Sequence, residues 1–470
     1  GATNLVTGVA DANMDHAPVV AIAGQAATTR LHKESHQVLD LVNMFRPITK
    51  YAAQILEPEI LPEIVRKAFK LAQLEKPGAC FIDFPENIAA MDTEAAPLTV
   101  QHAAPPSPAP QKIKQAGEVI SRARFPIVMA GNGVIRAGAG RDLLYFAESL
   151  NIPVATTFMA KGAIPASHPL SLGTVGLQAH DYVQCGFDRA DVIICVGYDI
   201  VEYHPNLWHK TRDRKLVHVD TRPAEVDAHY ILEVGVVGDI RASLRQLAGH
   251  ARPHEGHEID GLRYAINQEL HGQDDDDGFP VKPQRIIHEL RAALAPEDIV
   301  ICDVGAHKLW VARMYPAEAP NTCIISNGFA SMGIALPGAL AAAYAFPERK
   351  VVAVTGDAGF LMNSQEIETA MRLRVPFVVL IWNDSAYGLI EWKQQVHYRR
   401  TSHVAFANPD FVKYAEAFGA RGYRVERAED LGPILRQALA DRTVSLIDCP
   451  VDYRENLKLT EHLGEMVCPI

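Results

Sequence analysis

The chain has 470 residues, of which 48% are hydrophobic and 21% are charged, and its formal net charge is −11. This composition is typical of a globular protein of about three domains and excludes a disordered or fibrous chain. No apolar run reaches the roughly 18 residues of a membrane span, and the spread-out acidic charge argues against a nucleic-acid partner. The seven cysteines are scattered along the chain, which indicates a reducing, cytoplasmic compartment and no zinc site.

Two stretches divide the chain into three expected domains. Residues 97–111 contain the run Ala-Ala-Pro-Pro-Ser-Pro-Ala-Pro, which cannot hold a helix or a central strand and predicts an extended linker. A second polar passage, residues 250–283, is expected to hold one short helix at residues 259–270. The domains are therefore predicted at residues 1–96, 112–250 and 280–455.

Four short apolar runs follow the linker, and a helical pattern separates each run from the next. Such runs predict buried strands of a doubly wound parallel sheet. They begin at Phe125, Pro153, Asp191 and Lys215. The turn Gly131-Asn-Gly after the first run is either a tight turn or a nucleotide-binding loop, and it lacks the full glycine spacing of the latter.

The third domain is also predicted to be a parallel sheet, with acidic residues at two strand ends. The strand expected at residues 350–355 leads into Gly356, whose backbone freedom permits a sharp turn into a helix. The strand expected at residues 376–382 ends in an Asn-Asp pair. Because the carboxyl ends of parallel strands meet at one edge of a sheet, we expect Asp357 and Asp384 to lie close together.

The chemistry expected at this edge is the binding of a diphosphate and a divalent cation. A helix is predicted at residues 362–374 from apolar residues at helical spacing, and the free N–H groups of a helix start attract anions. Mg²⁺ prefers carboxylate, carbonyl and water oxygens, and Asp357 and Asp384 supply two carboxylates. The alternative is that the Gly-Asp and Asn-Asp pairs only form turns at strand ends.

Taken together, the Gly-Asp-Ala-Gly stretch and the Asn-Asp pair resemble the fingerprint of thiamine-diphosphate-dependent enzymes, Gly-Asp-Gly followed about 25 residues later by Asn-Asn or Asn-Asp. The two variants found here are similar to those of the acetolactate synthase branch. The metal ligands that this resemblance implies are Asp357, Asp384 and the carbonyl of Ala386. The cofactor contacts that it implies around them come from Gly356, Asp357, Ala358, Gly359 and Asn383.

Two further segments resemble parts of the same family. The turn formed by Gly305, Ala306 and His307 matches one that contacts the diphosphate, although a histidine in a turn is otherwise a cap or a surface group. Met332 matches a bulky residue that lies between the two rings of the cofactor and imposes its reactive, bent conformation. The alternative for Met332 is that it simply fills the core.

The resemblance extends over nearly the whole chain and implies three doubly wound parallel-sheet domains: pyrimidine-binding, central and diphosphate-binding. The chain is most similar to the catabolic, flavin-independent acetolactate synthases. The passages that carry this likeness begin at Arg30, Gly197, His218 and Pro450. The flavin-containing branch has an Arg-Phe-Asp-Asp-Arg type of run where this chain has Gly197-Tyr-Asp-Ile-Val-Glu-Tyr, so no FAD is expected.

The first domain is expected to be incomplete. In the family, the glutamate that activates the cofactor belongs to about the first 80 residues of the pyrimidine-binding domain, and this chain begins at a sequence that matches the middle of that domain. We therefore expect either a fragment or an N-terminally truncated protein. No glutamate of this chain is assigned the activating role.

The activity that the resemblance implies is decarboxylation of pyruvate on thiamine diphosphate with Mg²⁺, followed by condensation with a second pyruvate to 2-acetolactate. Gln37, beside His36, matches a position facing the reaction centre, or else the pair caps a helix start. A helix is expected at residues 387–395, along the acceptor pocket. Trp392 falls one residue before the acceptor-selecting tryptophan of the biosynthetic enzymes, so that role is not transferred to it.

In the family, cofactor sites lie between domains of different subunits, so a homodimer or a tetramer is expected. Two alternatives remain open at this point. The chain is a related decarboxylase or carboligase that uses another 2-keto acid, or it is a truncated, non-catalytic subunit that only binds the cofactor.

Overall fold

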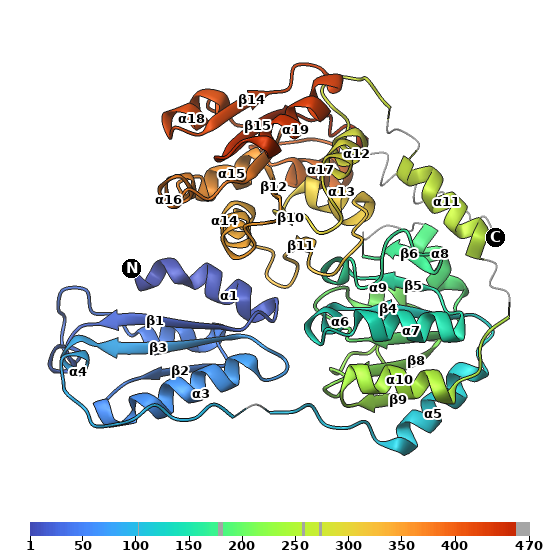
Figure 1. Ribbon diagram of the computed structural model, residues 1–470, viewed down its shortest axis with the longest axis horizontal. Helices are drawn as coiled ribbons and strands as arrows, with labels where there is room; N and C mark the ends of the chain where they lie inside the picture. The colour runs from blue at the N-terminus through green and yellow to red at the C-terminus, as the bar shows by residue number, and fades with distance from the viewer. Residues whose placement is uncertain (102, 177–181, 256–258, 272–274, 457–470) are drawn as a thin grey trace. The chain divides into compact units, whose positions relative to one another are not determined.

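The computed structural model describes residues 1–101, 103–176, 182–255, 259–271 and 275–456. Within these ranges the chain forms one three-stranded and two six-stranded sheets, all parallel (Figure 1). The prediction of an α/β protein built from three parallel sheets is confirmed. The chain divides into two compact units, one made of residues 1–105 with 327–331 and the other of residues 106–326 with 332–470.

The first unit contains the three-stranded sheet, in the order β1-β3-β2. Its strands are β1 (Val19–Gln25), β2 (Tyr51–Gln54) and β3 (Ala79–Pro85), and its helices are α1 (Val6–Met14), α2 (Leu41–Phe45), α3 (Leu61–Gln73) and α4 (Glu86–Ala89). Side chains of the middle strand alternate between two cores, as the period of a strand requires. Ile82 packs with α3, whereas Phe81 stacks on Phe45 of α2 with ring centroids 3.9 Å apart.

The second unit begins with the central domain, whose sheet has the order β6-β5-β4-β7-β8-β9. Its strands are β4 (Pro126–Ala130), β5 (Val154–Thr156), β6 (Ser171–Thr174), β7 (Val192–Val196), β8 (Lys215–Asp220) and β9 (Leu232–Val237). Its helices are α5 (Pro110–Ser121), α6 (Asn132–Arg136), α7 (Gly140–Leu150), α8 (Tyr182–Arg189), α9 (Pro205–Trp208) and α10 (Ile240–His250). The four predicted strands are β4, β5, β7 and β8. The outer strands β6 and β9 were not predicted, because neither is a continuous run of buried residues.

The chain between the two units has no regular structure from residue 92 to 101 and from 103 to 109, as the proline-rich sequence predicts. Its second half packs on the central domain: the N–H of Asp239 donates to the carbonyl of Pro106 at 2.7 Å. Proline at the first position of α5 then starts the helix, because its missing N–H has no partner to lose there. The helix predicted at residues 259–270 is α11 (Ile259–His271).

The C-terminal domain has a sheet of order β11-β10-β12-β13-β15-β14. Its strands are β10 (Ile299–Cys302), β11 (Cys323–Ile325), β12 (Val351–Gly356), β13 (Val378–Asn383), β14 (Arg421–Arg424) and β15 (Ser445–Pro450). Its helices are α12 (Pro283–Ala293), α13 (Ala306–Met314), α14 (Ala335–Ala345), α15 (Asp357–Asn363), α16 (Glu366–Leu373), α17 (Gly388–Tyr398), α18 (Phe411–Ala417) and α19 (Leu431–Ala440). The prediction of a single helix at residues 362–374 is wrong. The first helix, α15, already begins directly after Gly356, and a turn separates it from α16.

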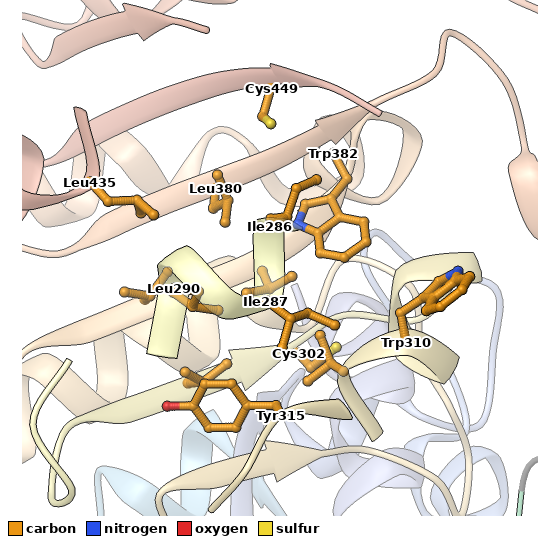
Figure 2. Close-up of a cluster of buried hydrophobic side chains, with 14 of the residues drawn as sticks. Ile286, Ile287, Leu290, Cys302, Trp310, Tyr315, Leu380, Trp382, Leu435 and Cys449 are labelled. Carbon is orange, nitrogen blue, oxygen red and sulfur yellow. The ribbon is translucent and has the colours of Figure 1, made fainter. Parts of the chain in front are cut away.

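Each face of this sheet has its own core. Figure 2 shows one face, where Leu380 and Trp382 of β13 lie among side chains of α12, α13 and α19. Val379 and Ile381 of the same strand point to the other face and pack with α14, α16 and α18. A strand buried on both faces explains why the sequence of β13 is apolar throughout and does not alternate with polar residues.

Lys161 joins the central and C-terminal domains inside the second unit. Its ammonium group is buried and donates hydrogen bonds to the hydroxyl of Thr174 at 3.0 Å and to the carbonyl of Ala312, in the last turn of α13, at 2.8 Å. Burial lowers the pKa of Lys161 to about 8. The next residue, Gly162, has a φ of +81°, and a Cβ there would collide with the carbonyl of Ala319, so only glycine fits this contact.

No helix in the described ranges is both long and apolar enough to cross a membrane. Five cysteines are buried free thiols: Cys80, Cys195, Cys302, Cys323 and Cys449. Cys468 lies outside the described residues.

Candidate cofactor and metal site

The carboxyl ends of β10, β12 and β13 form one edge of the C-terminal sheet. Cys302 of β10 lies beside Val354 of β12, and Gly356 of β12 lies beside Trp382 of β13. The residues that follow these strands, namely Asp303, Asp357 and Asp384, therefore leave the sheet at the same edge. This placement is the one that the sequence predicts for the two acidic strand ends.

Asp357 is the first residue of α15 and is almost fully buried. One carboxylate oxygen accepts the N–H of Ala358 at 2.8 Å, and the other accepts the N–H of Ser385 and the side-chain amide of Asn408, both at 2.7 Å. Burial raises the pKa of Asp357, and these hydrogen bonds oppose the rise. The carboxylate is thus held in a fixed position between the ends of two strands.

Asp384 is the second acidic residue of this edge. Burial and then the negative charge of Asp357 raise the pKa of Asp384 to about 8, while the N–H of Ala386 acts in the opposite direction. Two carboxylates that disfavour each other's ionisation form an arrangement that a divalent cation relieves. Gly388 follows closely, and a Cβ at this position would collide with the carboxylate of Asp384.

Among the described residues, no group of three or more His, Cys, Asp or Glu side chains is placed to hold a metal. The acidic side chains at this edge that could hold a metal are the two carboxylates of Asp357 and Asp384. Two carboxylates suit a cation such as Mg²⁺, which takes its other ligands from carbonyl, water and phosphate oxygens. Ala386 is buried beside Asp384 and pairs in a single β-bridge with Ala405.

Asn383 turns its side chain along the sheet edge toward β15. Its amide nitrogen donates to Asp448 at 2.8 Å, and its amide oxygen accepts from Asn408 at 3.0 Å. Asn408 thus joins the ends of β12 and β13 through Asp357 and Asn383. Sequence reasoning missed Asn408, because it lies in a loop 24 positions after Asp384 with no motif around it.

His307 lies in the second position of α13 with only 2% of its surface exposed, so it is not a surface group. Its ring packs against two glycines: a Cβ at Gly305 would lie 2.7 Å from the ring, and a Cβ at Gly356 would lie 3.4 Å from it. Burial lowers the pKa of His307 to about 3, so the imidazole is neutral at physiological pH. The predicted turn at residues 305–307 and the predicted Gly356 are therefore brought together.

Several buried polar atoms gather around this edge without a hydrogen-bond partner in the described part of the chain. They are Nε2 of His307, Nε1 of Trp382, Oδ1 of Asn408 and the hydroxyl of Tyr453. Trp382 packs between His307 and Tyr453, with ring centroids 6.2 Å from each. Buried polar atoms in native proteins are nearly always satisfied, so this group is the expected surrounding of a polar ligand.

Asp303 fixes the segment that carries Met332. Its carboxylate accepts the N–H groups of Gly333 at 2.8 Å and Ala335 at 3.3 Å, and the hydroxyl of Thr355 at 3.2 Å. Met332 itself is half-buried and precedes Gly333, whose φ is +86°. The sequence analysis did not identify Asp303, although it stands two residues before the predicted cofactor turn at Gly305.

Gln37 lies in the first compact unit, whereas the residues above lie in the second. It occupies an exposed turn with a φ of +56°. The alternative that this pair caps a helix is wrong, because Asp40 caps α2 by accepting the N–H of Asn43 at 3.0 Å. The predicted helix at residues 387–395 is α17, and Trp392 is its buried residue.

Comparison with known proteins agrees with this geometry. Residues 113–247 match the family described as "Thiamine pyrophosphate enzyme, central domain", and residues 303–449 match "Thiamine pyrophosphate enzyme, C-terminal TPP binding domain". Thiamine pyrophosphate is another name for thiamine diphosphate. The second match covers the strand ends that carry Asp303, Asp357 and Asp384.

Curated relatives cover nearly the whole chain. "Acetolactate synthase" of Bacillus subtilis is 34% identical over 99% of this chain and 84% of its own length. "Acetolactate synthase, catabolic" of Raoultella terrigena is 36% identical over 97% of this chain and 83% of its own length. "Probable acetolactate synthase large subunit" of Methanocaldococcus jannaschii is 33% identical over 99% and 82%. The chain therefore belongs to the acetolactate synthase family of thiamine-diphosphate-dependent enzymes.

Proposed function

We propose that the chain decarboxylates pyruvate and condenses the two-carbon product with a second pyruvate to give 2-acetolactate. The observation that carries this proposal is the pair of buried acidic strand ends, Asp357 and Asp384, in a chain whose relatives over nearly its whole length are acetolactate synthases. When bound, thiamine diphosphate supplies the electron sink that decarboxylation of a 2-keto acid requires. The chain's own residues bind and orient the reactants.

For the metal, we propose that Asp357, Asp384 and the carbonyl of Ala386 hold Mg²⁺. Two buried carboxylates whose pKa values are raised are the support for this role. Asn408 orients the carboxylate of Asp357 by donating to it, and it also donates to Asn383 at the end of β13. Asn383 in turn orients that strand end.

For the cofactor, we propose that the diphosphate binds at the start of α13 and α15. The residues in contact with it are Gly305, Ala306, His307, Gly356, Ala358, Gly359 and Asn383. The buried Nε2 of His307, which lacks a partner in the described part of the chain, supports this placement because a polar ligand at this edge would satisfy it. Met332, held by the contacts that Asp303 makes with the next residue, supports the bent form of the cofactor.

We place Gln37 at the substrate, where its amide donates to a carboxylate or keto oxygen. Its exposed turn leaves the amide available for this role. We further propose that the protein is flavin-independent, belongs to the catabolic branch, acts in the cytoplasm and forms a homodimer or a tetramer. The sequence Gly197-Tyr-Asp-Ile-Val-Glu-Tyr and the identity with the Raoultella enzyme support the branch.

The test is an assay of pyruvate consumption with Mg²⁺ and thiamine diphosphate, in which the product is decarboxylated by acid and measured as acetoin. Formation of acetoin that is lost in Asp384→Asn supports the proposal. Acetaldehyde in place of acetolactate, or turnover of glyoxylate only, points instead to a related carboligase or decarboxylase. Binding of the cofactor by calorimetry without turnover of any 2-keto acid points to a non-catalytic subunit.

A further inference from the structure

Tyr453 has a buried hydroxyl at the cofactor edge of the C-terminal sheet, and the proposed function gives it no role. The hydroxyl has no hydrogen-bond partner in the described part of the chain. The ring of Tyr453 packs against Trp382 of β13, with ring centroids 6.2 Å apart. The residue lies beyond residues 303–449, the stretch that matches the cofactor-binding domain. A buried phenol that has given up its hydrogen bonds to water without replacing them calls for an explanation.

Hydrogen bonds on both sides hold Tyr453 in place. Before it, the N–H of Val451 donates to the carbonyl of Asn383, at the end of β13, at 3.1 Å. After it, the side-chain oxygen of Asn456 accepts the indole N–H of Trp310, in α13, at 2.6 Å. The N–H of Asn456 also donates to the carbonyl of Tyr453 at 2.9 Å. The segment that carries the phenol is therefore tied both to the end of β13 and to α13.

The phenol lies near the acidic pair and near the start of α13. Burial first, and then the negative charges of Asp384 and Asp357, raise the pKa of Tyr453 above its usual value. The backbone of His307, in the first turn of α13, acts in the opposite direction. A Cβ at Gly388 would lie 3.3 Å from the ring of Tyr453 and would collide with the carboxylate of Asp384. Only a residue without a side chain leaves room for this approach of the phenol to the acidic loop.

The hydroxyl is a hydrogen-bond donor that lacks an acceptor. A phenol is protonated at neutral pH, and neither carboxylate of the acidic pair accepts its proton. Nε2 of His307, on the neighbouring helix, is also buried without a partner in the described residues. A cation at this edge brings no acceptor, whereas a diphosphate brings oxyanions, which form the stronger hydrogen bonds. The chemistry that completes the site is therefore that of a phosphate oxygen.

We propose that the hydroxyl of Tyr453 donates a hydrogen bond to the diphosphate, which makes Tyr453 a cofactor-binding residue. The inference rests on the proposed binding of the diphosphate at the start of α13. It adds a side-chain donor, from the segment after β15, to the backbone N–H groups of that helix. Without cofactor, the hydroxyl adds nothing to the stability of the folded chain, because it has no partner there.

The first measurement is calorimetric titration of the whole chain with thiamine diphosphate and, separately, with inorganic pyrophosphate, both at saturating Mg²⁺. Tyr453→Phe keeps the ring against Trp382 and removes only the hydroxyl. We expect Tyr453→Phe to bind both ligands about tenfold more weakly than the wild type, because a hydrogen bond to a charged acceptor is lost. Tyr344→Phe is the matched control: it removes the hydroxyl of a tyrosine in α14 that is 69% exposed, and it should bind both ligands like the wild type.

The second measurement is thermal unfolding of the same proteins with and without ligand. Without ligand, the unfolding midpoint of Tyr453→Phe should lie no more than about 2 °C below that of the wild type. With Mg²⁺ and thiamine diphosphate, the rise in the midpoint should be smaller for Tyr453→Phe, because weaker binding stabilises the folded state less. A purely structural hydroxyl gives the reverse pattern, with a lower midpoint in the unliganded variant and an unchanged rise.

Equal affinities of the wild type and Tyr453→Phe for thiamine diphosphate overturn the inference and leave the proposed function intact. A loss for thiamine diphosphate that is absent with pyrophosphate also overturns it, because the hydroxyl would then contact another part of the cofactor. An unliganded Tyr453→Phe that is unfolded or strongly destabilised shows a structural role and overturns it as well. If the wild type binds neither ligand, the proposed function fails at its cofactor site and the inference fails with it.

Discussion

Asp384 and Asp357 lie at the same edge of the C-terminal sheet. Burial, and to a smaller extent the negative charge of Asp357, raises the pKa of Asp384 to about 8. A carboxyl group whose pKa is about 8 holds its proton at neutral pH, whereas a metal ligand must release it. With no cation bound, the pair of carboxylates is therefore partly protonated, and a cation competes with protons for it.

From this we expect Mg²⁺ binding, in the presence of thiamine diphosphate, to release close to one proton at about pH 7. The apparent affinity for Mg²⁺ should rise by about tenfold per pH unit up to about pH 8 and then level off. Calorimetry in two buffers of different ionisation enthalpy measures both quantities. Asp384→Asn should bind Mg²⁺ more weakly and release no proton; an affinity that is independent of pH would contradict the role of Asp384.

Asn408→Ala tests the amide that joins the two strand ends. Its side chain donates to Asp357 at 2.7 Å and to Asn383 at 3.0 Å, so its loss frees the Asp357 carboxylate to move. We expect a 10- to 100-fold loss of affinity for Mg²⁺ with thiamine diphosphate, as about the magnitude for outer-shell partners of a metal. Titration calorimetry checks this, with Asn206→Ala on the exposed surface as control. Equal Mg²⁺ affinities of the two variants would show that Asn408 does not support the metal site.

Asp303→Asn tests the group that fixes the Met332 segment. Its carboxylate accepts three backbone N–H groups and one hydroxyl, and an amide in its place turns one acceptor into a donor facing donors. We expect the free energy of unfolding to fall by about 2–4 kcal/mol, measured in urea. Asp213→Asn, at an exposed carboxylate, should change stability by under about 0.5 kcal/mol. A loss for Asp303→Asn no greater than this would show that the network is not stabilising.

Glu202→Gln replaces a buried carboxyl group of the central domain with an amide, which does not titrate. Burial raises the pKa of Glu202 from 4.5 to about 7 in the folded chain, so the folded state holds the proton more tightly than the unfolded state does. The stability of the wild type relative to Glu202→Gln should therefore fall as the pH rises from about 4.5 to about 7, by about 3 kcal/mol, and stay constant above that. Urea unfolding at a series of pH values measures the difference. A constant difference would mean that the pKa of Glu202 is unshifted.

The strands that the sequence predicts are those buried on both faces. β4, β7, β12 and β13 are continuous apolar runs, which appear in sequence as a single unmistakable pattern. β6 and β9 lie at the edges of their sheet, where half-exposed positions interrupt that pattern. Their place depends on the strand beside them, and no local run of residues encodes it.

In the cofactor and metal site, too, only the residues that belong to a local sequence pattern are predictable. Asp357 and Asp384 are predictable because each directly follows a recognisable strand, and the register of parallel strands then brings them together. Asn408 reaches the pair from a loop, and Asp303 acts on a segment 30 positions away, so their contacts exist only after the chain has folded. The break between α15 and α16 was likewise hidden, because the apolar spacing continues across it.

Lys161 couples the unfolding of the central and C-terminal domains. The carbonyl of Ala312 receives its hydrogen bond from this central-domain ammonium group, and Gly162 fits only against the backbone of Ala319. If the C-terminal domain opened alone, it would leave a buried ammonium group without this acceptor and remove the wall behind Gly162. The two domains should therefore melt in one cooperative transition, and a protease that cuts the chain between them should yield two pieces that stay together.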